Sequence, residues 1–133
     1  MDTTPEYIEM CRKAVEIQEA WKPVAGDFTL SHRDGVKPLE SITIGLAELT
    51  PFGSNGSRIR ADMTWLPRQD QLQGMFLSSE HQHILGLNDY FNRYWANNEY
   101  LEMFEGNEHL EPFWLAFVMD KKYGKKWDGA EWK

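Results

Sequence analysis

Apolar side chains in the first twenty-one residues recur three or four positions apart, which is the spacing of one helix face. The face comprises Tyr7, Met10, Ala14, Ile17 and Trp21, and it is widened by Ile8, Cys11 and Val15. Such a stripe is typical of an amphipathic helix that buries one side. We therefore predict one helix over about residues 4–20.

Residues at both ends of this helix support the prediction. Thr3 or Thr4 can cap it, and Pro5 suits the first turn, where its missing N–H costs nothing. Pro23 ends it, because the residue before a proline is pushed out of the helical region.

Residues 27–65 change to a period of two, which indicates half-buried strands. Alternation predicts strands over residues 42–46 and 58–65, separated by a loop rich in turn-forming residues at 50–57. A third strand is expected at residues 27–32, followed by a turn at 32–35. The sequence thus predicts a small antiparallel sheet of about three strands.

From Pro67 the helical period returns and predicts three helices. The first carries Leu72, Met75 and Phe76; the second carries Ile84, Leu87, Phe91 and Tyr94 and ends at Asn97 and Asn98; the last covers about residues 108–123, with Leu110, Trp114, Phe117 and Val118 facing inward. Gly124 is a suitable terminator for the last helix.

The tail places Asp128 and Gly129 between Trp127 and Trp132, which indicates a tight turn with aromatic flanks. We expect this tail to fold back and pack against the last helix or the sheet. The fold class is therefore α+β: an N-terminal helix, a small antiparallel sheet of about three strands, three helices and a C-terminal turn.

Composition is that of an ordinary globular protein. The chain has 133 residues, of which 41% are hydrophobic and 26% are charged. A chain of this size buries about two thirds of its surface on folding, enough for a core without disulfides or metals. We expect residues 1–133 to form a single domain.

The charge balance and the termini narrow the function classes. The formal net charge is −7, which disfavours general nucleic-acid binding. The first residues lack the basic and apolar regions of a secretory signal, and no apolar stretch is long enough to span a bilayer. With a single cysteine, Cys11, the chain is expected to be a soluble cytoplasmic protein without a membrane contact.

Motifs that carry chemistry are missing from the sequence. The four histidines, His32, His81, His83 and His109, have no helical i, i+4 partner among them, and Cys11 falls on a core face. There is no phosphate-binding loop or nucleophile elbow. We predict no catalytic residue, no metal site and no cofactor.

Three arginines form one candidate site. Arg58, Arg60 and Arg68 surround the predicted strand and the helix start at Pro67, where a helix N-terminus adds partial positive charge. A carboxylate or phosphate could bind beside Arg58, Arg60, Arg68 and Asp70. The competing interpretation is that Asp62 and Asp70 neutralise these arginines in surface ion pairs of little energetic worth.

Five glutamates fall on every third position from residue 99 to residue 111, with no lysine or arginine between them: Glu99, Glu102, Glu105, Glu108 and Glu111. One interpretation is a solvated acidic face, followed by a basic helix end at residues 121–126. The other is an acidic contact strip for a basic partner.

The six tryptophans divide into two groups. Trp21, Trp65 and Trp114 lie on predicted buried faces and are expected in the core. Trp127 and Trp132 flank the C-terminal turn and are the candidates for partner binding.

Three segments, at residues 16–28, 64–76 and 113–132, carry distinctive motifs. They are represented by Ile17, Gln18, Trp21, Pro23, Gly26 and Asp27; by Trp65, Leu66, Pro67, Gln69, Leu72 and Gln73; and by Leu115, Ala116, Phe117, Val118, Met119, Tyr123, Gly124, Lys125, Trp127, Asp128, Gly129 and Trp132. With these motifs the chain resembles a family of small uncharacterised phage and prophage proteins of Gram-positive bacteria. Residues 29–62 and 77–112 match the family only loosely. The resemblance implies a phage or prophage origin and supplies no activity or catalytic residue.

Together these observations favour a non-enzymatic accessory protein that acts by binding a protein of the phage or its host. The alternative is a small-anion-binding protein or enzyme that uses the arginine site.

Overall fold

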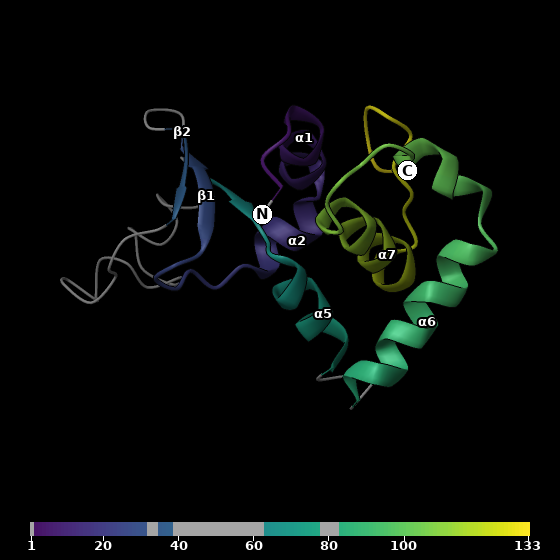
Figure 1. Cartoon of the computed structure of the whole chain (residues 1–133). Helices are drawn as coiled ribbons and strands as arrows, with labels where there is room; N and C mark the ends of the chain where they lie inside the picture. Colours follow the sequence, from purple (N-terminus) through teal and green to yellow (C-terminus); the bar gives the residue numbers. More distant parts are fainter. Residues whose placement is uncertain (1, 32–34, 39–62, 78–82) are drawn as a thin grey trace. The chain divides into compact units, whose positions relative to one another are not determined.

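The computed structural model describes residues 2–31, 35–38, 63–77 and 83–133 (Figure 1). The chain divides into two compact units: Thr3–Pro67, and Arg68–Lys133 together with Asp2. Helices and an antiparallel sheet are both present, which confirms the α+β class. The expectation of a single domain stays a prediction.

The first unit begins with two short helices, α1 (Pro5–Lys13) and α2 (Val15–Ala20). The side chain of Thr4 caps α1 by accepting a hydrogen bond from the backbone N–H of Tyr7, and Pro5 occupies the first turn. The predicted apolar face is confirmed, since all five of its residues are fully or almost fully buried: Tyr7, Met10, Ala14, Ile17 and Trp21.

The prediction of one continuous helix over residues 4–20 is wrong at Ala14. This residue leaves the helical region, with φ −81° and ψ 73°, and separates α1 from α2. The Cys11 carbonyl near the end of α1 accepts a hydrogen bond from the Gln18 side chain at 3.0 Å. The change of direction also leaves Val15 exposed, although an unbroken helix would place it on the apolar face.

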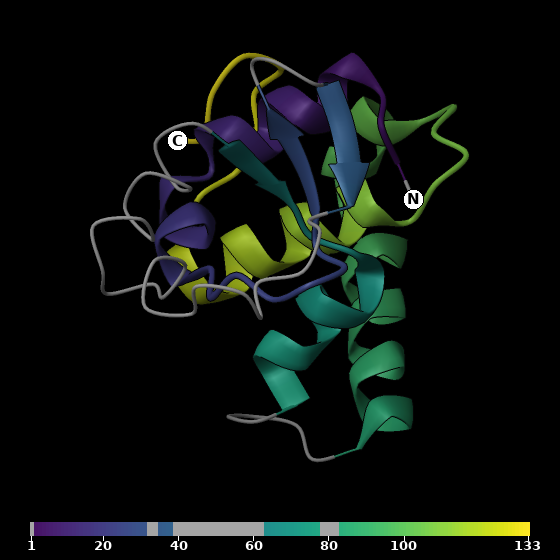
Figure 2. The same ribbon diagram turned by 90° about the vertical axis from the view of Figure 1, so that its left-hand side faces the viewer.

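The sheet is antiparallel, with β1 (Phe28–Ser31) between β2 (Gly35–Pro38) and β3 (Met63–Leu66) (Figure 2). β1 matches the strand expected at residues 27–32, and β3 includes the end of the strand expected at 58–65. β2 was not expected, because Gly35–Pro38 contains a glycine and a proline and has no alternating pattern. The strand predicted at residues 42–46 lies outside the described residues.

Gln18 joins the short helices to the outer edge of β3. Its side-chain oxygen accepts a hydrogen bond from Trp65 N at 2.9 Å, and its Nε2 donates to Trp65 O at 3.0 Å. One amide side chain therefore pairs with the strand as a neighbouring strand would. The Tyr7 hydroxyl donates to Pro67 O at 2.6 Å, which fixes α1 against the residue that follows β3.

Two buried tryptophans complete this unit. The rings of Trp21 and Trp65 stack with centroids 5.9 Å apart. The Trp21 indole N–H donates to the buried carboxylate of Asp27 at 2.8 Å, and the Val24 N–H donates to the same carboxylate oxygen. The core positions expected for Trp21 and Trp65 are confirmed.

The second unit contains α5 (Gln69–Leu77), α6 (Ile84–Ala96), the 3₁₀ helix η1 (Glu99–Phe104) and α7 (Glu111–Tyr123). Phe117 of α7 contacts Phe76 of α5 and three rings of α6, Tyr90, Phe91 and Tyr94. Trp114 stacks on Phe91 with centroids 4.0 Å apart. α7 is therefore the helix around which the others pack, and Pro112–Met119 are buried apart from the half-buried Phe113.

The ends of the helices agree with most of the predicted signals. α6 ends at Ala96, just before Asn97 and Asn98. α7 ends at Gly124, whose φ of +66° is the left-handed conformation that glycine adopts easily. The prediction that Leu110 faces inward is wrong: α7 starts one residue later, and the Leu110 side chain is exposed.

One polar contact also ties α6 to α7. The Tyr94 hydroxyl donates a hydrogen bond to Asp120 at 2.6 Å. The pKa of Tyr94 is raised above its usual range, mainly because the side chain is buried and also because it bonds to a carboxylate. None of the helices in the described ranges combines the length and apolarity that crossing a bilayer requires.

Candidate functional site

Residues 126–133 form a small β-hairpin. Lys126 and Lys133 exchange both backbone hydrogen bonds, at 2.9 and 3.0 Å, and Trp127 pairs with Trp132 in antiparallel register. The Asp128 N–H donates to Glu131 O at 3.1 Å. The expected turn with two aromatic flanks is therefore confirmed.

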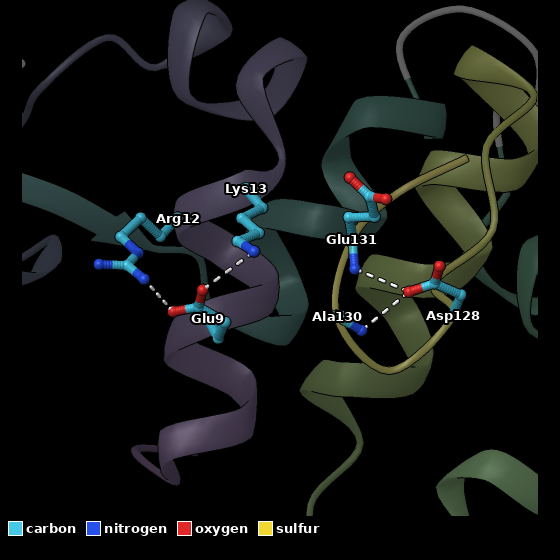
Figure 3. A network of polar contacts seen from close by, with 6 residues as sticks. All are labelled: Glu9, Arg12, Lys13, Asp128, Ala130 and Glu131. Atoms are coloured by element: carbon cyan, nitrogen blue, oxygen red, sulfur yellow. Dashed lines mark hydrogen bonds and ion pairs between the residues drawn. The ribbon is translucent and has the colours of Figure 1, made fainter.

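Asp128 closes the turn of this hairpin (Figure 3). One of its carboxylate oxygens accepts hydrogen bonds from the backbone N–H groups of Ala130 and Glu131, each at 2.8 Å. These bonds, with a 3.0 Å ion pair to Lys133, lower the pKa of Asp128 to about 2. Gly129, between Asp128 and Ala130, has a φ of +101°, a conformation that other residues rarely adopt.

Figure 3 shows a second, separate cluster on α1. Glu9 pairs with Arg12 and with Lys13, the latter at 3.4 Å. The hydrogen bond from Arg12 lowers the pKa of Glu9. Because these side chains lie three and four residues apart on one helix and face solvent, they give α1 modest local support and no binding site.

The two tail tryptophans differ in exposure. They are a non-hydrogen-bonded pair, in which side chains approach closely, and their ring centroids are 5.2 Å apart. Trp127 is only 2% exposed, whereas Trp132 is half-buried. Of the two residues predicted to bind a partner, Trp132 is the one with side-chain surface that a partner can touch.

Tyr100 fixes the hairpin to η1. The Trp127 N–H donates a hydrogen bond to the Tyr100 hydroxyl, and Lys126 Nζ lies 5.9 Å from the centroid of the Tyr100 ring. Tyr100 also stacks on Trp95 of α6, with centroids 5.6 Å apart. Burial raises the pKa of Tyr100 above its usual range. The tail therefore folds back with Trp127 buried, as expected, but the contact shown here is with Tyr100 of η1 rather than with the last helix or the sheet, and the sequence pattern did not single out that residue.

The acidic run begins on η1. Asn98 caps η1 by accepting a hydrogen bond from Tyr100 N at 3.0 Å. Residues three apart are eclipsed in a 3₁₀ helix, so Glu99 and Glu102 lie on one ridge, and Glu105 follows at its C-cap. The opposite side anchors η1, because Phe104 is buried between Trp95 and Phe113. This 3₁₀ helix was not predicted from the sequence, and it contains only the first two of the five regularly spaced glutamates.

We use "segment 99–110" for η1 and the residues that lead into α7. Its exposed apolar side chains are Leu101, Met103 and Leu110, with 36%, 42% and 49% of their surface exposed. Its exposed glutamates are Glu99, Glu102, Glu105 and Glu108. None of these four carboxylates forms an ion pair with a residue that the structure describes. Glu111, the fifth glutamate of the run, is buried at the start of α7.

The candidate anion site is described only in part. Arg58 and Arg60 lie outside the described residues. The Arg68 backbone N–H donates to Gln71 Oε1 at 2.9 Å, as in a capping box at the start of α5. The Arg68 side chain pairs with Asp70 at 3.2 Å. The structure thus brings Arg68 and Asp70 together as an ion pair, as the competing interpretation of this site expects.

Among the residues with described positions, no group of three histidine, cysteine, aspartate or glutamate side chains is placed to hold a metal ion. His83 and His109 are exposed, and His32 and His81 lie outside the described ranges. Cys11 is fully buried, as expected for a core residue.

Comparison with known proteins gives no relative from which a role can be transferred. No protein-family model, no curated protein and no solved structure matches this chain.

Proposed function

We propose that this chain is a phage- or prophage-type accessory protein of the cytoplasm that acts by binding another protein rather than by catalysis. The observation that carries the proposal is segment 99–110. Three apolar side chains, Leu101, Met103 and Leu110, are exposed close together in sequence on a segment that is held on both sides. In the 3₁₀ helix Leu101 and Met103 lie on the two ridges that flank the glutamate ridge, so apolar and acidic side chains alternate around the exposed part of η1.

The packing behind the segment supports this assignment. Phe104 is buried beneath η1, and Tyr100 is held by Trp95 on one side and by the Trp127 N–H on the other. A surface presented by a rigid support loses little conformational entropy when a partner binds. The hairpin therefore contributes to the proposed function as a support, with the half-buried Trp132 at its side.

The test is a capture experiment from cells in which a prophage has been induced. A double variant, Leu101→Ser with Met103→Ser, is expected to lose the captured protein. A matched variant, Val24→Ser with Leu85→Ser, removes two exposed apolar side chains elsewhere and is expected to retain it. Equal capture by wild type and both variants would remove segment 99–110 from the proposal.

The alternative function, binding of a small anion near Arg58, Arg60 and Arg68, stays a prediction. It gains support from the position of Arg68 at the start of α5, where backbone N–H groups carry partial positive charge. A ligand bound to the folded state raises the melting temperature by mass action. Phosphate or a dicarboxylate should then stabilise the protein, and Arg68→Ala should abolish the shift.

A further inference from the structure

Resting on the proposed function, we infer that segment 99–110 binds a basic polypeptide segment in which lysine or arginine side chains alternate with apolar ones. The inference concerns the chemistry of the partner. It follows from the juxtaposition of exposed Leu101, Met103 and Leu110 with four exposed glutamates, Glu99, Glu102, Glu105 and Glu108.

The charge of the segment selects the partner. The sequence contains no lysine or arginine from residue 94 to residue 120, so the run has no basic neighbour in sequence. Lys126 of the hairpin lies 5.9 Å from the centroid of the Tyr100 ring of η1, so the segment is acidic with a lysine beside it. Elsewhere in the molecule exposed carboxylates do find bases: Glu9 pairs with Arg12, and Asp89 pairs with Arg93 at 3.0 Å. The four glutamates of segment 99–110 form no ion pair with a residue that the structure describes, and complementary potentials are what guide two proteins into register.

The apolar side chains require that the partner supply more than charge. A purely basic chain would leave Leu101, Met103 and Leu110 in contact with water. A partner that places apolar groups on them gains about 25 cal/mol for each Å² removed from solvent. A segment that carries both kinds of side chain satisfies the two halves of this surface.

The same charges argue against three other occupants. Nucleic acids and anionic membrane surfaces are negatively charged and would be repelled. A second copy that used the same face would place glutamates against glutamates, because a two-fold interface contacts itself. The lysines at residues 121–126 of another copy also have the charge to pair with this face. The test below distinguishes such self-association from binding of a different basic partner.

The experiment measures binding of synthetic peptides about four helical turns long by fluorescence anisotropy. One peptide combines leucine and lysine, a second replaces every lysine by glutamate, and a third replaces every leucine by serine. Wild-type protein is expected to bind the leucine–lysine peptide and neither of the others. Raising the NaCl concentration from about 50 mM to about 500 mM should weaken that binding, because salt screens exposed charges.

Two pairs of variants test the residues. Glu102→Gln with Glu105→Gln should weaken binding about three- to tenfold, the effect expected from losing two exposed ion pairs. Glu6→Gln with Glu19→Gln removes the same net charge from exposed positions outside the segment and should leave binding unchanged. Leu101→Ser with Met103→Ser should weaken binding of the leucine–lysine peptide without changing its salt dependence.

Several outcomes would overturn the inference. They are absence of binding at about millimolar protein, equal binding of the leucine–glutamate peptide, and equal loss in the two charge variants. Sedimentation that shows self-association, lost in the Glu102/Glu105 variant, would assign the surface to a second copy instead. The proposed function has its own test, because it predicts that the Leu101/Met103 variant loses the protein that the wild type captures from cells. If a captured partner binds equally well at low and high salt and to the Glu102/Glu105 variant, the proposed function is supported and the inference of a basic partner is wrong.

Discussion

The two compact units hold their chains together by different means. In Thr3–Pro67, side chains bond to the backbone of residues far away in sequence: Gln18 reaches Trp65, which is 47 residues distant, and Tyr7 reaches Pro67. In Arg68–Lys133, ring-to-ring contacts link the helices, with Phe117 at their centre. Both units have buried apolar cores, but long-range side-chain-to-backbone bonds are prominent in the first and ring contacts between helices are prominent in the second.

This difference has a consequence for function. In the second unit Phe104 of η1 is buried and Tyr100 is half-buried, whereas Leu101, Met103 and the glutamates at 99, 102, 105 and 108 are exposed. The polar bonds of the first unit instead occupy the outer edge of β3, which would otherwise invite another strand to pair with it. In the first unit the Gln18 side chain thus occupies a potential pairing edge, whereas the second unit leaves apolar and acidic side chains of segment 99–110 exposed.

The largest expected effect comes from removing the hairpin. Deletion of residues 126–133 takes away the buried Trp127 and the hydrogen bond to Tyr100. Loss of a buried large aromatic costs about 3–5 kcal/mol, a large share of the about 5–15 kcal/mol that stabilises a small domain. The urea midpoint should fall accordingly. An unchanged midpoint would mean that the tail is not structural and that both tryptophans are available to a partner.

The unit that contains Arg68–Lys133 was more predictable from the sequence than the unit Thr3–Pro67. Regular spacing of Leu87 and Phe91 predicts α6, and the flanks of Asp128 and Gly129 predict the hairpin, because in both cases the signal lies between near neighbours. The contact of the hairpin with Tyr100 was not predictable, since no pattern connects residues 27 positions apart.

The unit Thr3–Pro67 shows why the rest of the fold could not be predicted. The apolar face from Tyr7 to Trp21 is real, yet its periodicity does not reveal the break at Ala14. That break accompanies bonds from Gln18 to Cys11 and Trp65, and the second of these depends on a strand much later in the chain. β2 has no alternation to detect, and its pairing with β1 gives it strand geometry. For the candidate site, the glutamates were visible, whereas the exposure of Leu110 depended on where α7 begins.

A smaller loss of stability is expected when the edge of β3 loses its hydrogen bonds to Gln18. Gln18→Ala removes three hydrogen bonds and leaves Trp65 N–H, Trp65 O and Cys11 O without that side chain. Part-buried backbone groups that lose a partner cost about 1–3 kcal/mol in free energy of unfolding, measurable by urea titration.

Two variants sharpen this result. Gln18→Glu keeps an acceptor for Trp65 N–H but cannot donate to the two carbonyls, so it should destabilise at least as much as alanine. Glu19→Ala changes the exposed neighbour on the same helix and should shift the midpoint little. Equal midpoints for Gln18→Ala and Glu19→Ala would show that the three hydrogen bonds of Gln18 contribute nothing to stability.

The smallest expected effect is a pH dependence in the hairpin. The pKa of Asp128 is about 2 in the folded protein and about 3.9 in an unfolded chain. Its charged form thus stabilises the fold fully above the unfolded pKa, and this contribution is lost as the pH falls from about 4 to about 2. Asp128→Asn keeps an oxygen that can accept from Ala130 and Glu131 but cannot titrate. Urea midpoints measured across that window should therefore fall further in wild type than in Asp128→Asn.

Because the largest cause of the lowered pKa is the backbone N–H bonds rather than Lys133, added salt should change this difference only slightly. A difference that disappears in salt would instead assign the effect to the ion pair with Lys133, and parallel curves for the two proteins would show that the turn does not stabilise the Asp128 carboxylate.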